Sequence, residues 1–382
     1  MRTVALAPSL WFARRSRTTW GWRGLPRLFS RARGARDGWL DPAARKISLE
    51  LRSDGAGDTV NLVPLVQEIA ARHPGAELTV VTNHPEIPFP MCAPNVRSVD
   101  RVPPGQPRSC HLDLSPEVRY HLLCPHWLQY VLIAGLSSVT LRDDPFPLLG
   151  DEDGGLWARL GAEPFVLLHA RNMRTAWEGR NTDAENFLFL VRRLRDAGYR
   201  VWGIGNDGEP QDEIPHLGRL TMVQLVHAVR RARGFVGVDS FPMHLAALYD
   251  KPILGYFGAT YPFVVLTPVT RFVALRNEAL SCNGCVYVTR PVGYNKCWFG
   301  DQRCGARLPD EYLERQLERF APLLRDPDAR IDEPRPDLLE QQLRAAQLLY
   351  EEALLIEDLR HRITIPAGLR EMIRAMVSWD KT

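Results

Sequence analysis

The sequence predicts an α/β protein with two Rossmann-like domains, a Cys-rich metal-binding loop and a helical C-terminal tail. Three observations lead to this fold class. The chain has 382 residues, more than one hydrophobic core usually supports. Strand-like and helix-like segments alternate in two separate series, and four cysteines crowd into residues 282–304. We therefore expect two domains of about 150 residues each, with extensions.

The first series begins after a basic leader. Residues 46–52 (KISLELR) alternate like a strand, residues 53–58 form a glycine-rich turn, residues 59–75 have apolar residues at helical spacing, and residues 76–83 are again strand-like. A strand, helix and strand within about thirty residues predict one βαβ unit with a right-handed crossover.

The second series repeats this order further along the chain. It predicts strands and helices in alternation at residues 164–170, 183–198, 199–205, 221–233, 234–240, 242–250 and 251–258. An acidic, Pro-rich segment at 141–155 is interpreted as the linker between the halves, and residues 310–324 and 337–363 are helical. The predicted domains are an N-terminal extension (1–45), two Rossmann-like domains (46–155 and 156–330) and a helical tail (331–382).

The composition is that of a globular protein. Hydrophobic residues make up 45% of the chain and charged residues 24%, and no stretch reaches the roughly 18 consecutive apolar residues of a membrane span. The seven cysteines do not resemble a secreted disulfide framework, so we expect a reducing, cytoplasmic setting.

Positive charge is concentrated in residues 1–45. This leader has ten arginines, no lysine and two aspartates, a balance of +8, whereas the whole chain carries +3. Because the arginines are mixed with Trp, Phe and Leu, the leader is a candidate for peripheral contact with the inner face of the membrane or for docking a partner. The alternative is a weakly ordered terminal extension.

A candidate proton acceptor lies in the first glycine-rich turn. Gly55 and Gly57 allow the backbone to approach a ligand closely, and Asp58 follows them at the start of a helix. A carboxylate there can take a proton from a hydroxyl group. The alternative is that Asp58 only caps the helix.

Three arginines follow the first strand of the second series. Arg171, Arg174 and Arg180 lie in one loop, and the guanidinium fork matches phosphate oxygens. The loop is therefore a candidate for binding a nucleotide diphosphate, with a solvated charged loop as the alternative.

A third candidate is the turn in FVGVDSFPMHLAALYD. Asp239 and Ser240 end a strand, Phe241 begins the turn into a helix, and His244 lies in that helix. Free N–H groups at a helix start favour an anion. The alternatives are a capping role for Asp239 and Ser240, and a His244 satisfied by its helix neighbours.

The cysteine cluster predicts a metal site. Cys282 and Cys285 form a C-x2-C pair that is followed by Cys297 and Cys304, and four thiolates suit tetrahedral zinc or iron. We expect one structural metal ion, with reduced thiols or disulfides as alternatives.

Together these segments resemble glycosyltransferase family 9, the ADP-heptose:lipopolysaccharide heptosyltransferases and their relatives. The resemblance covers roughly residues 46–307 and depends on GDTVNLVPLVQEIAARHPGAELTVVTN and GRLTMVQLVHAVRRARGFVGVDSFPMHLAALYDKPILGYFGATYP. It implies a fold of the glycosyltransferase B type, in which residues 46–155 bind the acceptor and residues 156–330 the nucleotide-sugar. It also implies inverting transfer without an obligatory metal at the reaction centre.

The resemblance also assigns residues. It implies that Gly57 and Asp58 form the Gly-Asp motif, with Asp58 as general base, and that Asp239, Ser240 and His244 belong to the loop that holds the donor. Two positions depart from the family pattern. Arg180 stands where the family usually has Lys, and Phe241 replaces a Gly, which alters the sugar side of the pocket.

The cysteines are similar to the metal-binding finger of bacterial autotransporter heptosyltransferases, which modify protein side chains, hold iron and form large oligomers. The expected activity is therefore heptose transfer from ADP-heptose to a hydroxyl of a protein or of the lipopolysaccharide core, in an enzyme that forms a homo-oligomer.

Two rival functions remain at the level of sequence. One is a transferase that uses another nucleotide sugar. The other is a metal-ribbon nucleic-acid-binding protein with phosphate contacts from the leader. The basic excess is confined to residues 1–45, so we expect no nucleic-acid partner.

Overall fold

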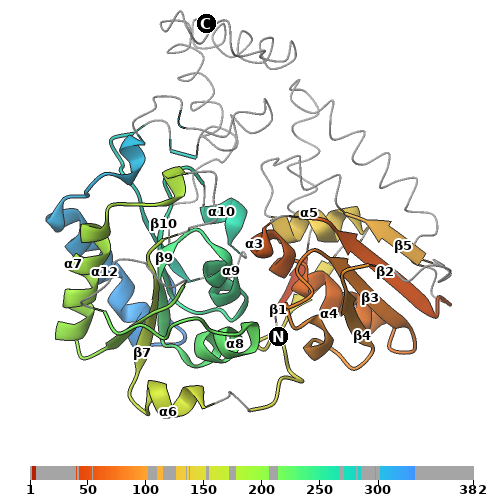
Figure 1. The fold of residues 1–382 in the computed structure, drawn as a ribbon. Helices are drawn as coiled ribbons and strands as arrows, with labels where there is room; N and C mark the ends of the chain where they lie inside the picture. Colours follow the sequence, from red (N-terminus) through yellow and green to blue (C-terminus); the bar gives the residue numbers. More distant parts are fainter. Residues whose placement is uncertain are drawn as a thin grey trace, which may run out of the picture. The chain divides into compact units, whose positions relative to one another are not determined.

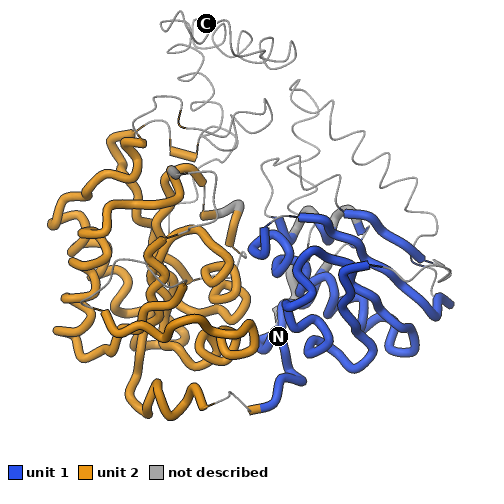
Figure 2. The backbone as a smooth tube through the Cα atoms, in the orientation of Figure 1, with its two compact units in different colours: residues 1–150, 366–375 blue, residues 151–365, 376–382 orange. Residues whose placement is uncertain are grey.

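The structure is a computed structural model. It describes residues 2–5, 40, 43–53, 55–101, 110–114, 126–134, 136, 138–151, 155–171, 178–205, 214–260, 262–266, 271–280, 283–284, 297 and 302–331. These residues form two compact units that meet in sequence between Gly150 and Asp151 (Figure 2). The predicted tail beyond residue 331 and most of the predicted N-terminal extension lie outside the described residues.

Unit 1 contains a sheet of four parallel strands in the order β4-β3-β2-β5 (Figure 1). The strands are β2 (Lys46–Leu51), β3 (Glu77–Thr82), β4 (Val96–Val99) and β5 (Cys110–Asp113). A short 3-10 helix, η3 (Phe89–Met91), precedes β4. The chain moves outward from β2 through β3 to β4 and then returns to place β5 on the other side of β2. This is the order of a Rossmann half, with its switch point between β2 and β5.

The predicted helix at 59–75 is in fact two helices, α3 (Ala56–Val60) and α4 (Val63–Arg72). The break has a local cause in Pro64, which lies in the first turn of α4. Proline has no N–H to donate and its ring clashes with the carbonyl four residues earlier, so a helix restarts just before it. The short α3 is thereby a separate element that carries Asp58.

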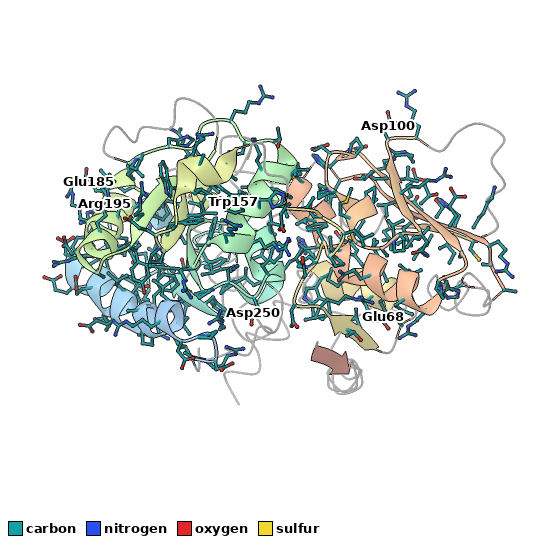
Figure 3. The ribbon with its side chains drawn as sticks, turned by 90° about the horizontal axis from the view of Figure 1, so that it is seen from below. Glu68, Asp100, Trp157, Glu185, Arg195 and Asp250 are labelled. Carbon is teal, nitrogen blue, oxygen red and sulfur yellow. The ribbon has the colours of Figure 1, made fainter. Side chains whose placement is uncertain are left out.

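Unit 1 also has a two-stranded antiparallel sheet, in which β1 (Arg2–Ala5) pairs with β6 (Ser138–Leu141). Residues 2–5 of the predicted extension are therefore part of this unit. The backbone N–H of Thr140 donates to Glu68 of α4 at 2.9 Å, which ties the small sheet to the helix (Glu68 is labelled in Figure 3). Helix α5 (His126–Ile133) also packs against α4.

The segment 141–150, which the sequence predicts as part of an interdomain linker, packs on unit 1 instead. Phe146 is fully buried, and the Gln67 amide of α4 donates to the carbonyl oxygens of Asp144 and Pro145 at 3.2 and 2.9 Å. Burying a Phe side chain contributes about 2–3 kcal/mol, enough to outweigh the loop-like composition. The division between the two units, between Gly150 and Asp151, lies within the predicted linker 141–155, and the first part of that segment belongs to unit 1.

Unit 2 contains five parallel strands in the order β11-β10-β9-β7-β8. They are β7 (Phe165–His169), β8 (Arg200–Gly203), β9 (Gly234–Val238), β10 (Ile253–Tyr256) and β11 (Phe272–Leu275). Helices α7 (Ala184–Asp196) and α12 (Asp310–Arg325) cover one face, and α8 (Met222–Arg231) and α9 (Phe241–Leu248) cover the other (Figure 1). Unit 2 is thus a three-layer αβα domain.

Shorter helices complete this unit: α6 (Leu156–Leu160), η5 (Glu178–Arg180), α10 (Pro262–Val265) and η7 (Arg303–Gly305). Trp157 of α6, labelled in Figure 3, lies edge-on to His227 of α8 with ring centroids 6.1 Å apart. The Arg231 guanidinium stacks 3.3 Å from the Trp157 ring centroid. The aromatic contacts attach α6 to α8.

The helix boundaries of unit 2 follow sequence signals. Asp183 caps α7 by accepting from the backbone N–H of Glu185 at 2.9 Å, and Gly198, just beyond the end of α7, has φ +85°. Thr221 and Gln224 form a capping box at the start of α8. These are the residue types that stabilise free helix ends. The predicted mixed α/β fold with parallel sheets is confirmed.

Candidate active site

Both candidate motifs follow strands that border a switch point. The loop with Asp58 follows β2, which lies between β3 and β5, and Asp239 follows β9, which pairs with β7. In unit 2, β8 and β9 lie on opposite sides of β7. Ligands of doubly wound proteins bind at the carboxyl ends of strands at such points. Each unit therefore carries its candidate residues where its own fold favours a ligand.

Asp58 is the third residue of α3 and does not cap it. The N-cap residue is Gly55, and no side chain caps that helix end. Each oxygen of the Asp58 carboxylate has a partner: the Ser53 hydroxyl lies 2.8 Å from Oδ2 and His126 Nδ1 lies 3.0 Å from Oδ1. The Asp58 side chain is 18% exposed, so the carboxylate is held in place yet open to a ligand.

The glycine turn fixes Ser53 for this contact. The Gly55 N–H donates to Ser53 Oγ at 3.1 Å, which leaves the hydroxyl proton for Asp58. A Cβ atom at Gly55 would lie 3.1 Å from Asp58 Oδ2, so a side chain there would press on the carboxylate. The Gly57 carbonyl accepts from the Asn61 amide at 3.0 Å and thereby braces α3. The turn thus positions the carboxylate as well as the backbone.

Sequence reasoning missed His126, which comes from α5. The same helix contacts Asp58 a second time, because Tyr130 donates its hydroxyl to the Asp58 carbonyl oxygen at 3.3 Å. Residues four apart lie on one face of a helix, and HWLQY places His and Tyr at that spacing. This polar pair on a largely apolar helix is the signal in the sequence that could have indicated a role for His126.

Asp239 lies at the centre of the candidate site in unit 2. Its side chain is 1% exposed, with Arg180 Nε 3.6 Å from Oδ2 and His244 Nε2 3.4 Å from Oδ1. Burial alone would raise the pKa of Asp239, but the charge of Arg180 and the proximity of His244 and Thr260 outweigh it and hold the pKa well below its usual range. Asp239 is therefore ionised at neutral pH. Thr260, which follows β10, was not among the predicted site residues.

Ser240 does not cap α9 with its side chain, although it occupies the N-cap position. Its hydroxyl donates to the Val238 carbonyl at 3.0 Å and lies 2.9 Å from Nδ1 of the buried His169. Burial, followed by the nearby charge of His216, lowers the pKa of His169 to about 4. His169 is therefore neutral at pH 7, and its Nδ1–H donates to Ser240, whose own proton is already used.

The two other predicted residues of α9 differ in exposure. Phe241 is the first residue of the helix and is half-buried, whereas His244 is buried with Nδ1 2.9 Å from the Val265 carbonyl oxygen. A neutral or charged imidazole donates through that nitrogen, so Nε2 is directed at Asp239. The structure thus brings together Arg180, Asp239, Ser240 and His244.

Backbone contacts hold Arg180 in place. The Gly179 carbonyl accepts from the Ala259 N–H at 3.2 Å, and the Asp183 N–H donates to the Gly305 carbonyl at 2.7 Å. The short helix η5 is thus attached both to the loop after β10 and to η7. This attachment places the Arg180 guanidinium against Asp239.

Arg171 belongs to the same unit and lies two residues after His169 in the chain. It lines a cavity of about 460 Å³ together with Asn181, Thr182, Gln302 and Arg303, among others. Two arginines and several amide or hydroxyl groups suit a polar or anionic ligand. Arg174, the third arginine of the predicted phosphate loop, lies outside the described residues.

Two of the four predicted metal ligands are described. Cys304 is buried, its pKa is raised by burial, and Cys297 is close enough to raise it further. Two neighbouring thiols fit part of a zinc or iron donor set. Cys282 and Cys285 lie outside the described residues, and within the described ranges no group of three or more His, Cys, Asp or Glu side chains forms a metal site. The metal remains a prediction.

Comparison with solved structures supports the fold. The chain is similar to the iron-containing dodecameric glycosyltransferase TibC from enterotoxigenic E. coli H10407, with 16% identity, TM-score 0.53, and 73% of this chain and 79% of that chain covered. TibC in complex with ADP-D-beta-D-heptose gives 16% identity and TM-score 0.53, with 74% and 77% covered. A family 9 glycosyl transferase from Veillonella parvula DSM 2008 gives 12% identity and TM-score 0.53, with 75% and 99% covered.

The sequence comparisons identify the class of protein. No curated protein matches the chain significantly. Residues 175–291 match the model of glycosyltransferase family 9 (heptosyltransferase), and this segment includes Arg180, Asp239, Ser240 and His244. The protein is therefore a glycosyltransferase. The resemblance to family 9 that the sequence predicts is confirmed.

Among the described helices, none has the length and apolar character needed to cross a membrane.

Proposed function

We propose that the protein transfers a heptose from ADP-heptose to a hydroxyl group of a protein side chain or of the lipopolysaccharide core, with inversion at the anomeric carbon. The observation that carries this proposal is the Asp58 carboxylate, held by Ser53 and His126 at the switch point of unit 1 and still 18% exposed. The match to the heptosyltransferase family over residues 175–291 and the fold shared with TibC support the choice of sugar.

In the proposed reaction Asp58 acts as general base. The acceptor hydroxyl gives its proton to the Asp58 carboxylate, and the acceptor oxygen forms a bond to the anomeric carbon from the face opposite the diphosphate. The bond from that carbon to the diphosphate oxygen breaks, and its electron pair leaves with ADP. A single displacement of this kind inverts the anomeric carbon.

The donor side needs positive charge for the departing diphosphate. Arg180 is 23% exposed and is oriented by the buried Asp239, so part of the guanidinium surface remains for phosphate oxygens. The first turn of α9 adds the backbone N–H of Phe241, since Pro242 has none and those of Met243 and His244 donate to the Ser240 carbonyl. One well-placed donor of this kind contributes about 3 kcal/mol to the barrier reduction.

Other parts of the proposal do not bear on the reaction centre. Cys282, Cys285, Cys297 and Cys304 would hold one structural iron or zinc ion, which would order the loop that carries them. We also propose a homo-oligomer that works in the cytoplasm, with the basic leader at the inner face of the membrane.

A panel of donors tests the sugar and the nucleotide. The purified protein is titrated with ADP-heptose, GDP-sugars and UDP-sugars, and the melting temperature is measured. We expect only the ADP-heptose series to raise it, because a ligand that binds the folded state stabilises that state.

A second experiment measures transfer of the sugar to the acceptor and the anomeric configuration of the product. NMR of the product linkage should show the anomeric configuration opposite to that of the donor. Stabilisation by a UDP- or GDP-sugar alone, or a product with retained configuration, would contradict the proposal.

A further inference from the structure

We infer that His126 is a positioning residue which, together with Ser53, fixes the Asp58 carboxylate for proton abstraction. This inference rests on the proposed function. Its basis is the arrangement in unit 1, where a buried imidazole from α5 and a hydroxyl from the β2 loop contact the two oxygens of one carboxylate.

The two contacts restrict different oxygens. Ser53 lies on Oδ2 at 2.8 Å and His126 on Oδ1 at 3.0 Å, so rotation about the bond to the carboxylate is opposed from both sides. An ionised carboxylate has about four acceptor sites, more than the two contacts with Ser53 and His126 occupy. A general base must lie within hydrogen-bond reach of that proton, which a freely rotating carboxylate satisfies only part of the time.

Exposure decides which of the two titratable groups meets the acceptor. The side chain of Asp58 is 18% exposed and that of His126 is 9% exposed. The imidazole Nδ1 also lies 3.0 Å from Asp58 Oδ1, so this nitrogen faces the carboxylate. Asp58 is therefore the group in contact with the substrate, and His126 acts through it.

The position of His126 does not depend on the ion pair alone. Trp127 and Val131 of the same helix are buried, and Tyr130 anchors the helix to the Asp58 carbonyl oxygen. A substitution at His126 thus removes a side-chain contact while the packing and the backbone anchor of the helix remain. This makes the role of His126 testable without loss of the fold.

The test compares His126→Leu with His126→Asn. The asparagine amide nitrogen occupies nearly the place of Nδ1, so it can donate to Oδ1 without carrying a charge. We expect His126→Leu to lower kcat by about 100-fold with KM for the donor changed less than about 3-fold, since a displaced group costs turnover rather than binding. His126→Asn should keep kcat within about 5-fold of wild type.

His111 provides a matched control in the same unit. It lies on β5 with Nε2 3.5 Å from Glu50, so it is also a histidine beside a carboxylate. His111→Leu should leave kcat unchanged. Ser53→Ala tests the same arrangement from the other oxygen, with an expected loss of about 10-fold in kcat, and it serves if His126→Leu fails to fold.

The outcomes separate the inference from the proposed function. Absence of transfer by the wild-type protein with every donor contradicts the proposed function. Wild-type transfer with full turnover by folded His126→Leu overturns the positioning role alone. Equal losses of kcat in folded His126→Leu and His126→Asn also overturn the positioning role. The asparagine would then supply an N–H group near Asp58 Oδ1 without restoring turnover, so the effect of His126 would depend on its charge or on proton transfer.

Discussion

Asp58 and Asp239 occupy similar places in sequence, each after a strand and near the start of a helix, but their surroundings differ. Asp58 is 18% exposed and is held by a hydroxyl and an imidazole, whereas Asp239 is 1% exposed and lies against Arg180 and His244. An aspartate that contacts a substrate must be partly exposed to solvent. An aspartate that holds neighbouring side chains in place is more effective when buried, because electrostatic interactions are stronger in the protein interior. The comparison favours the proposed roles, a reactive carboxylate in unit 1 and an organising one in unit 2.

This difference changes how Asp239 can affect a nucleotide. A carboxylate with 1% exposure has almost no surface for a ligand, and its negative charge would repel phosphate. Its effect on a nucleotide must therefore pass through Arg180 and His244, whose positions it fixes. In unit 1 the relation between the aspartate and its neighbours is the opposite one, because Ser53 and His126 hold the Asp58 carboxylate in position.

The largest expected effect is on turnover. Asp58→Ala should lower transfer by about 1,000-fold or more, because general bases contribute 10²–10⁴-fold, while the affinity for ADP stays within about 3-fold. Steady-state transfer assays and calorimetry with ADP measure the two quantities. Full turnover by this variant would break the assignment of Asp58 as the reactive carboxylate.

Asp239→Ala should act on stability and nucleotide affinity together. Removing the buried carboxylate leaves Arg180 and His244 without their partner, so the free energy of unfolding should fall by about 3–5 kcal/mol and ADP should bind about 10-fold more weakly. Urea unfolding and calorimetry provide the measurements. Asp58→Ala is the matched control, with a smaller expected loss of stability; equal losses would erase the contrast between the two aspartates.

A third prediction concerns the pH dependence of stability. The folded pKa of His169 is about 4, below its ordinary 6.5, so the unfolded chain binds more protons between these values. The stabilisation from His169 is thus complete above about pH 6.5 and decreases by up to about 3 kcal/mol as the pH falls to 4.

Urea unfolding of wild type and His169→Asn at several pH values tests this window. The asparagine amide can still donate to Ser240 Oγ, but it does not titrate, so the slope between pH 6.5 and 4 should flatten. The window of Asp239 does not overlap, because its depressed pKa places the loss of its stabilisation below about pH 4. An unchanged slope in the variant would contradict a neutral, buried His169.

The sequence predicted the elements that have strong local signals. The helices of unit 2 begin at capping residues such as Asp183 and Thr221, and their predicted bounds differ from the observed ones by a few residues. The strands β1, β4, β5, β6 and β11 were not predicted. Each has four residues, too few for an alternating pattern to stand out, and unlike the equally short β8 and β10 none of them follows a predicted helix.

The sequence by itself determined the alternation of strands and helices, and it placed Asp58 and Asp239 just after strands, at the carboxyl edge of a parallel sheet. Only the tertiary structure decided what holds each of them. His126 lies 68 positions from Asp58 in the chain, and His169 lies 71 from Ser240. Periodicity and capping act over a few residues, whereas such pairs form only when packed helices and paired strands bring distant residues together.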